Sequence, residues 1–372
     1  MKSLLLLSAA LGLSLTACRN STDRQTAQQT TTSPDSTGTD WAMLPFEKVD
    51  SLNPVLVPSP ALTFRDPIWK KDVKWEEKDV FNPAAVVRDG KVYLVYRAED
   101  KLGKYAGVSR LGLAISSDGL HFEKEDKPIF FPDNDAQKKY EWEGGSEDPR
   151  IVESPQGDYV MTYTAYDGKT ARMMLATSPD LRKWTKHGPV LGEGKHLNTW
   201  SKSGAIVAKQ KGDQIVAEKI NGKYWMYFGD TNLFLAQSDD LIHWTPLEEA
   251  DGSLKPIVRP RPGKFDGQLV EPGPYALLTE KGILLIYNSA RPIPDKKDAL
   301  VYSAGQVLLD KQDPTRIVAR TSEPFFVTEK NYELTGQVNN VVFLEGLVPF
   351  KNKWFLYYGT ADSKIAVAVH EN

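Results

Sequence analysis

The sequence contains a single cysteine, Cys18, in 372 residues, so it has no internal disulfide bridge. Its five histidines are not spaced as ligand pairs, and neither a metal site nor a cofactor is predicted. A G-x-S-x-G nucleophile motif and a phosphate-binding glycine loop are also absent. The net charge of −3, with scattered basic residues, gives no reason to expect a nucleic-acid partner. Strong helical periodicity is lacking, which points to an all-β fold.

The first 18 residues have the features of an export signal. Lys2 precedes an apolar stretch of about a dozen residues, which is too short to span a bilayer. The stretch ends in "LTAC", which resembles a bacterial lipobox, where cleavage leaves Cys18 to be lipidated. An ordinary signal peptide with an incidental cysteine is the alternative. We expect a lipoprotein anchored in the membrane through Cys18, and Arg19 in place of an aspartate favours the outer membrane.

Residues 19–40 are rich in Ser, Thr and Gln and almost free of apolar side chains. Because such a segment cannot bury enough surface to offset the entropy of ordering, we expect a disordered tether. Residues 41–372 are then left for the folded part, which is long enough for one large domain.

Five similar segments divide this folded part. Each has a short apolar strand, a turn and a second dense strand pattern, as in "RDGKVYLVYRA" at 88–98 and "FKNKWFLYYGT" at 350–360. The spacings between successive turns are 67, 65, 60 and 70 residues, measured from Gly90, Gly157, Gly222, Gly282 and Asn352. Repeats of this length built from short strands are typical of propellers. The sequence predicts an all-β, five-bladed β-propeller, in which the segment 44–75 supplies the outer strand missing from the fifth blade.

Polar residues stand at the start of the first strand in every repeat. In a propeller the innermost strands line a central channel, so these side chains are expected to share one pocket. They are Asn82, Glu147, Asp148, Lys202, Ser203, Glu271, Asn339, Asn340 and Glu345. Two carboxylates across a channel can cleave a glycosidic bond, one as the acid and one as the base for water. For Glu147, Asp148 and Arg150 the alternative is a structural ion-pair cluster at a turn.

With "FNPAAVV", "YLVYRAED", "GGSEDPRIV" and "YYGTADSKIAVA" at the expected blades, the chain resembles glycoside hydrolase family 130 over about residues 75–370. The resemblance implies a five-bladed propeller that acts on β-mannosides, either as a phosphorylase or as a hydrolase. It implies Asp148 as the general acid, with its proton relayed through the mannose 3-hydroxyl. The residues that hold the terminal mannose, or orient the acid or the sugar, are by the same resemblance Asn82, Arg97, Glu147, Arg150 and Asp362.

The sequence departs from the family's phosphorylases at the positions of their phosphate-binding residues. Asp230 stands where a basic residue of the third blade is expected, and Asn288 replaces a histidine of the fourth. Since phosphate needs clustered positive charge or fixed donors, these changes favour water as the nucleophile. Glu218 and Glu271 add carboxylates, and we expect one of them to be the general base. For Glu218 the alternative is a solvated turn residue paired with Lys219 or Lys223.

The expected function is exo-acting, inverting hydrolysis of β-mannosides, with β-1,2-linked manno-oligosaccharides as substrates. Lys202 and Asn288 are expected to contact the substrate. Lys202 can also bind phosphate, so a phosphorylase that forms mannose 1-phosphate is the second interpretation. A glycan-binding lipoprotein without catalysis is the third.

Overall fold

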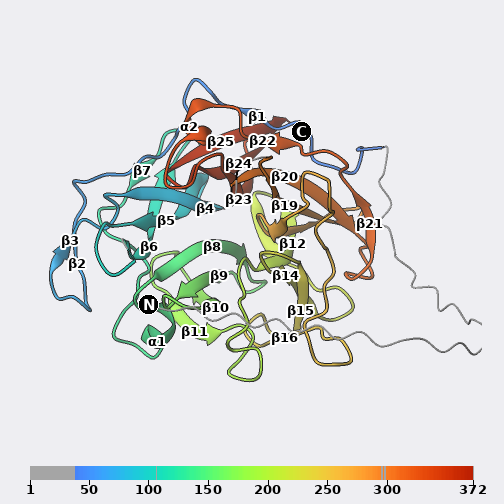
Figure 1. Cartoon of the computed structure of the whole chain (residues 1–372), viewed down its shortest axis with the longest axis horizontal. Coiled ribbons are helices and arrows are strands. Elements are labelled where there is room, and N and C mark those ends of the chain that lie inside the picture. Colours follow the sequence, from blue (N-terminus) through green and yellow to red (C-terminus); the bar gives the residue numbers. More distant parts are fainter. Residues whose placement is uncertain (1–37, 106, 295, 297–298, 372) are drawn as a thin grey trace, which may run out of the picture. The chain divides into compact units, whose positions relative to one another are not determined.

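The blades of a five-bladed β-propeller surround a common centre, as the sequence predicts (Figure 1). The computed structural model describes residues 38–105, 107–294, 296 and 299–371. The predicted signal, the lipidation site Cys18 and nearly all of the predicted tether lie outside the described residues. Within the described ranges, no helix is long and apolar enough to cross a membrane.

The first two blades are four-stranded antiparallel sheets. The turns predicted at Gly90 and Gly157 join their first two strands, and both glycines adopt left-handed conformations, with φ of 69° and 94°. The strands of the first blade are β4 (Asp79–Arg88), β5 (Lys91–Glu99), β6 (Ser109–Ser116) and β7 (Glu123–Lys124). Those of the second are β8 (Gly145–Glu153), β9 (Tyr159–Tyr166), β10 (Ala171–Ser178) and β11 (Thr185–Pro189).

The third and fourth blades are less regular. The innermost strand β12 of the third blade pairs first with β14 and then with β13, and in the fourth blade β17 and β18 both pair with β19. The strands of the third blade are β12 (Ala205–Lys211), β13 (Gln214–Ala217), β14 (Tyr224–Phe228), β15 (Phe234–Ser238) and β16 (Trp244–Pro246). Those of the fourth are β17 (Leu269–Pro272), β18 (Ala276–Leu278), β19 (Ile283–Pro292), β20 (Leu300–Leu309), β21 (Ile317–Arg320) and β22 (Phe326–Val327).

The fifth blade is closed by the N-terminal segment of the described chain. β1 (Glu47–Lys48) pairs antiparallel with β25, and Leu56 forms an isolated bridge with Ile365, so the expected outer strand is present. Pairing of this kind covers the edge that the last strand would otherwise expose. The other strands of this blade are β23 (Val342–Phe350), β24 (Lys353–Thr360) and β25 (Lys364–Glu371). Outside the blades lie β2 (Phe64–Arg65), β3 (Asp72–Val73), α1 (Lys138–Glu141) and α2 (Asn331–Leu334).

A buried tyrosine in the strand that follows the predicted turn of each repeat stabilises the blades. Every one of these rings is at most 1% exposed, and every hydroxyl donates a hydrogen bond of 2.7 or 2.8 Å. The rings supply apolar contact area while the bonded hydroxyls avoid the cost of a buried, unpaired polar group. The five are Tyr96, Tyr163, Tyr227, Tyr287 and Tyr357.

Candidate active site

Local backbone irregularities set the direction of the polar side chains at the strand starts. The pairing register shifts between Phe81 and Pro83 in β4, and between Glu147 and Arg150 in β8. Asn82 and Asp148 lie at these shifts, with φ of 47° and 49°. A bulge adds a residue that the ladder does not pair, and so redirects its side chain. The left-handed backbone is costly for residues with a Cβ, and such strain is concentrated at functional sites.

Asp148 lies at the centre of the cluster that these bulges form. Its side chain is buried, and its Oδ1 accepts hydrogen bonds from Asn82 Nδ2 at 3.0 Å and Arg97 Nη1 at 3.2 Å. Lys202 Nζ lies 3.7 Å from its other oxygen, Oδ2. The structure therefore brings together predicted site residues from the first three blades.

Arg97, in β5, connects several carboxylates. Its Nη2 donates to Glu147 at 3.1 Å and to Glu99 at 2.7 Å, and its Nε donates to Ser109 Oγ at 3.0 Å. Sequence reasoning did not single out Glu99, although its spacing is a usable signal: residues two apart on a strand point to the same face. Glu99 also forms an ion pair with Lys78 at 2.7 Å.

Glu271, the last residue but one of β17, lies on the other side of Lys202. Lys202 Nζ is 3.6 Å from Glu271 Oε1, and Ser203 Oγ donates a short hydrogen bond to the same oxygen. The distance between Asp148 Oδ2 and Glu271 Oε1 therefore cannot exceed the sum of their distances to Lys202 Nζ. This limit is compatible with the roughly 6.5–9.5 Å that an inverting glycosidase needs to admit a water molecule.

Arg150 crosses the centre of the ring below Asp148. It starts in β8, yet its Nε and Nη2 donate to the carbonyls of Gly273 and Pro272 in the fourth blade, both at 2.7 Å. Its Nη1 lies 2.5 Å from Glu345 of the fifth blade and donates to the backbone carbonyl of Asp148 at 3.2 Å. Arg150 therefore holds the backbone of Asp148, and its own side chain is 1% exposed.

Glu147 and Asp148 form a coupled pair. Burial raises the pKa of Glu147 to about 7, and the charge on Asp148 adds to the rise. Burial also acts on Asp148, but the cations Arg97 and Lys202 hold its pKa below the usual range. Below about pH 7 the pair therefore carries one proton, and the two residues titrate together.

The other ionisable groups respond to the same field. Burial raises the pKa of Glu271, and Lys202 opposes the rise. Burial likewise raises the pKa of Asp362 to about 7, against the opposing effect of Arg97. For Lys202 burial is outweighed by the carboxylates of Glu271 and Asp148, which raise its pKa and keep it charged.

Glu218 lies away from this cluster, and its proposed role as a base needs correction. Its backbone N–H donates to the carbonyl of Val207, which lies within β12, four residues beyond Ser203. Its carboxylate, 35% exposed, forms an ion pair with Lys211 at 3.2 Å. The alternative of a lysine-paired surface residue is the one observed, although the partner is Lys211 and not Lys219 or Lys223.

Asn288 also differs from its expected role. Its side chain is fully buried, its Nδ2 donates to the carbonyl of Leu344 at 3.0 Å, and its Oδ1 accepts from the N–H of Leu344 at 2.8 Å. The amide thus joins the fourth and fifth blades rather than facing a substrate.

In the sequence, Asp230 was noted only because it stands where a basic residue is expected. In the structure it lies near Lys202 and Glu271. The N–H of Gly229 donates to the carbonyl of Lys202 at 2.9 Å, and the carbonyl of Thr231 accepts from Val270 N–H at 3.3 Å.

Tyr302, at the start of β20, is a further neighbour of Glu271 that no motif indicated. Burial and the charge on Glu271 raise the pKa of its hydroxyl to about 12.

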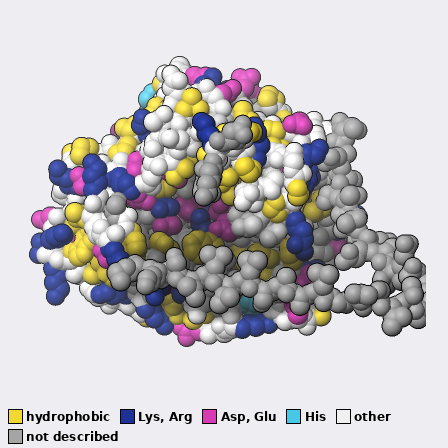
Figure 2. Space-filling view, viewed as in Figure 1, with side chains coloured by type: hydrophobic (Ala, Val, Ile, Leu, Met, Phe, Trp, Pro, Cys, Tyr) yellow, Lys and Arg dark blue, Asp and Glu magenta, His cyan; other side chains and the backbone are white. Residues whose placement is uncertain are grey.

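Acidic and basic side chains gather in the middle of the face shown in Figure 2. Carboxylates outnumber cations in the cluster, and each of its cations, Arg97, Arg150 and Lys202, already has carboxylate neighbours. In the described part of the chain, no group of three or more His, Cys, Asp or Glu is arranged to hold a metal ion.

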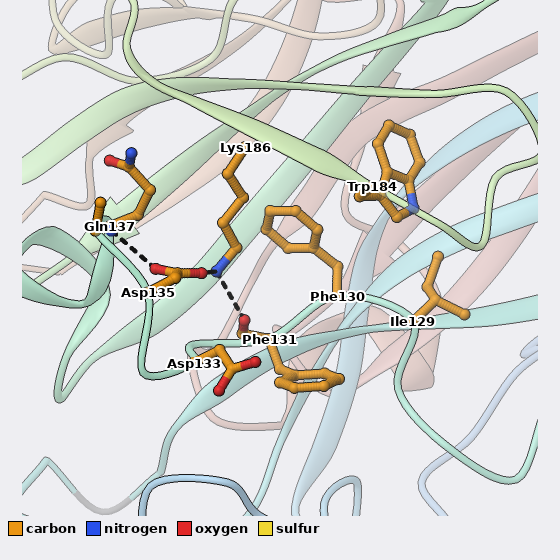
Figure 3. A pocket seen from close by; sticks show the side chains of 9 residues that line it. Ile129, Phe130, Phe131, Asp133, Asp135, Gln137, Trp184 and Lys186 are labelled. Carbon is orange, nitrogen blue, oxygen red and sulfur yellow. Dashed lines mark hydrogen bonds and ion pairs between the residues drawn. The ribbon is translucent and has the colours of Figure 1, made fainter.

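A separate pocket of about 320 Å³ lies beside Phe130, Trp184 and Lys186 (Figure 3). Its lysine is held by Asp135 at 3.1 Å and by Glu141 at 2.6 Å. None of the residues of the charged cluster lines this pocket, so the two are separate.

A family model described as beta-1,4-mannooligosaccharide phosphorylase matches residues 59–372. The chain belongs to glycoside hydrolase family 130. The family resemblance seen in the sequence is confirmed, and the enzyme acts on mannosides.

Relatives within family 130 carry out both reactions. A 1,2-beta-oligomannan phosphorylase from Thermoanaerobacter sp. (strain X514) is 36% identical over 311 residues, which cover 81% of this chain and 93% of the relative. A glycosyl hydrolase structure from Bacteroides ovatus is 48% identical with a TM-score of 0.85, and the match covers 89% of this chain and 95% of that one. A further structure, titled for family members that are glycoside hydrolases targeting beta-1,2 mannosidic linkages in Candida mannan, is 46% identical with a TM-score of 0.86 and covers 91% and 97%.

Proposed function

We propose that this family 130 enzyme is an exo-acting, inverting β-mannosidase whose substrates are β-1,2-linked manno-oligosaccharides. The observation that carries the proposal is the position of Lys202, which bridges the carboxylates of Asp148 and Glu271 at 3.7 and 3.6 Å. The bridge supports a close pairing of the proposed acid with the proposed base. Such a pair matches the requirement of a single displacement by water.

In the proposed reaction, Glu271 removes a proton from a water molecule as its oxygen attacks the anomeric carbon. The glycosidic carbon–oxygen bond breaks, and the leaving oxygen takes a proton from the Glu147–Asp148 pair, which Asp148 delivers through the mannose 3-hydroxyl. The Glu147–Asp148 pair can supply that proton up to about pH 7, because burial raises the pKa of Glu147 to that value. The products are mannose of inverted configuration and a shortened glycan.

The closed centre of the ring supports exo action. Arg150 reaches from β8 to the fourth and fifth blades directly below the acid, and its side chain and that of Glu345 are at most 1% exposed. A glycan cannot thread past these side chains. One end of the chain must enter from the open side, so that a terminal sugar is released.

The charge balance favours water over phosphate. A phosphate dianion requires cations that are not already neutralised. Here Lys202 lies near the carboxylates of Asp148 and Glu271, and Asp230 adds negative charge beside it. These carboxylates repel a second anion, whereas a neutral water molecule experiences no such repulsion.

Phosphorolysis is the second candidate function. Two observations favour it: Lys202 remains charged within the site, and the relative that is 36% identical is named a phosphorylase. In that case phosphate would take the place of water and mannose 1-phosphate would be the product.

Product analysis on β-1,2-mannobiose, with and without phosphate, separates these reactions. The proposal expects mannose in phosphate-free buffer, first as the α-anomer in NMR spectra, and no such product from Asp148→Asn. Mannose 1-phosphate formed only in the presence of phosphate would establish phosphorolysis instead. Oligosaccharide binding without turnover in either buffer would mean a glycan-binding protein.

We also propose a lipid anchor at Cys18, on the basis of the "LTAC" sequence. Radiolabelled palmitate supplied to an expressing bacterium is expected to enter the wild-type chain and not Cys18→Ser. Equal labelling of the two chains, or none in the wild type, would leave the ordinary signal peptide as the explanation.

A further inference from the structure

Three aromatic rings form a continuous row beside the cluster of carboxylates. The centroids of Tyr105 and Tyr166 are 6.1 Å apart, and those of Tyr166 and Trp200 are 6.3 Å apart. Tyr105 is 38% exposed and Trp200 is 48% exposed, whereas Asp148 is 2% exposed. The row therefore lies at the open side of the site, and the catalytic carboxylates lie deeper.

The row is connected to the cluster at two points. Trp200 precedes Lys202 by two residues, and its indole Nε1 donates to Asp230 Oδ2 at 2.6 Å. Tyr166, the last residue of β9, pairs with Gly145 at the start of β8, which in turn pairs with Ser109, the hydrogen-bond partner of Arg97. A ligand that contacts the rings can therefore extend into the space around the catalytic residues.

Two glycines make room for the tyrosine rings. A Cβ at Gly144 would lie 2.4 Å from the ring of Tyr166, and a Cβ at Gly168 would overlap Tyr105. The rings pack directly on the backbone, which reduces the entropy that they lose when a ligand binds. Gly144 belongs to the same "GGSEDP" motif that carries the acid.

A pocket of about 470 Å³ lies next to the indole. Its volume is within the range of roughly 300–1,000 Å³ typical of small-ligand sites. Hydroxyl, amide and carboxylate groups lie beside aromatic rings in its wall, which consists of Thr199, Trp200, Asp230, Thr231, Asn232 and Phe234. This combination suits a pyranose, since the ring carbons can pack on an aromatic face while the hydroxyls bond to oxygen and amide groups.

From this geometry we propose that Trp200 and Asp230 bind the sugar on the leaving-group side of the bond that is cleaved, and that Tyr166 and Tyr105 bind the sugars that follow. The proposal rests on the proposed function, because a terminal sugar held at Asp148 forces the rest of the chain out through the open side. The row is then a determinant of chain-length preference.

Kinetics on β-1,2-linked mannobiose, mannotriose and mannotetraose test the proposal. Trp200→Ala is expected to raise KM about tenfold for all three, the upper range of what one aromatic contact contributes. Tyr105→Ala is expected to raise KM only for the longer two. Trp200→Phe, which keeps an aromatic face and loses the bond to Asp230, should recover most of the affinity. If KM is unchanged in both alanine variants, or if Trp200→Phe is as impaired as Trp200→Ala, the aromatic subsites are disproved.

Calorimetric binding of mannotetraose to Asp148→Asn separates this proposal from the proposed reaction. Weaker binding when Trp200→Ala is added to Asp148→Asn supports the subsites even if the wild-type enzyme does not hydrolyse the glycan. Turnover by the wild type together with equal binding by the two variants would retain the reaction and overturn the subsites. Thermal unfolding of every variant identifies any that fails to fold.

Discussion

Lys202 Nζ lies 3.6 Å from Oε1 of Glu271, the proposed base, so the two side chains form an ion pair. Glu271 is buried, and Lys202 opposes the rise in pKa that burial causes. A general base must be ionised when the substrate binds. Lys202 therefore keeps Glu271 available as a base.

Lys202→Met is expected to raise the pKa of Glu271 further, because burial then acts without the neighbouring cation. The acidic limb of the kcat/KM profile should move to higher pH, and kcat/KM at pH 7 should fall at least about tenfold. Lys202→Arg, which keeps the charge, is the control. An acidic limb at the wild-type position in Lys202→Met would show that Lys202 does not set the ionisation of Glu271.

Glu271→Gln and Glu218→Gln distinguish the two glutamates that the sequence nominated. Glu271→Gln removes the base beside Lys202 and is expected to lower kcat by about 10²–10⁴-fold. Glu218→Gln, on the Lys211 side of β12, should stay within about twofold of wild type, because it breaks only a partly exposed ion pair. Initial rates on β-1,2-mannobiose measure both, and a larger loss for Glu218→Gln would reverse the assignment.

Glu147→Gln tests the shared proton of the coupled pair. Burial raises the pKa of Glu147 to about 7, so deprotonation of the pair should produce a basic limb of kcat/KM near that pH. In Glu147→Gln only Asp148 can hold the proton, and Arg97 and Lys202 hold its pKa low. The basic limb should then move to lower pH and activity at pH 7 should decrease. An unmoved limb would assign it to another group.

Gly359→Ala tests the support of Asn82. A Cβ at Gly359 would lie 2.4 Å from Asn82 Oδ1, so the amide must move away from Asp148. We expect lower kcat and a destabilisation of about 1–3 kcal/mol, measured by denaturant unfolding. Gly194→Ala is the matched control, since nothing lies within 4 Å of a Cβ at that position. Equal kcat in the two variants would mean that Asn82 does not position the acid.

The repeat pattern predicted the architecture because each blade encodes its own turn and its own buried strands. The turn residues Gly90, Gly157, Gly222, Gly282 and Asn352 all adopt positive φ. Local sequence determines such turns, since a left-handed backbone favours glycine and asparagine. The charged residues at the beginning of the inner strands could be recognised for the same reason, because they are polar residues next to apolar runs.

The distinction between Glu271 and Glu218 was not visible in the sequence. In the sequence, each of the two glutamates lies next to an apolar segment. In the structure, Glu271 lies at the channel end of β17, whereas the backbone N–H of Glu218 bonds to the middle of β12. Asn288 was misread for a related reason: its neighbour Leu344 is 56 residues away in the chain, so only the packing of two blades shows that its amide is used. Depth along a channel depends on how strands of different blades align.

The sequence by itself determined the five-bladed fold, the family and the set of charged groups that face the channel, because turns, strand periodicity and motifs are properties of short segments. Only the tertiary structure decided which of those groups meet. The bulges at Asn82 and Asp148, and the reach of Arg150 across three blades, depend on contacts between distant segments. The proposed acid, base and bridging cation are therefore a consequence of how the blades close around a common centre.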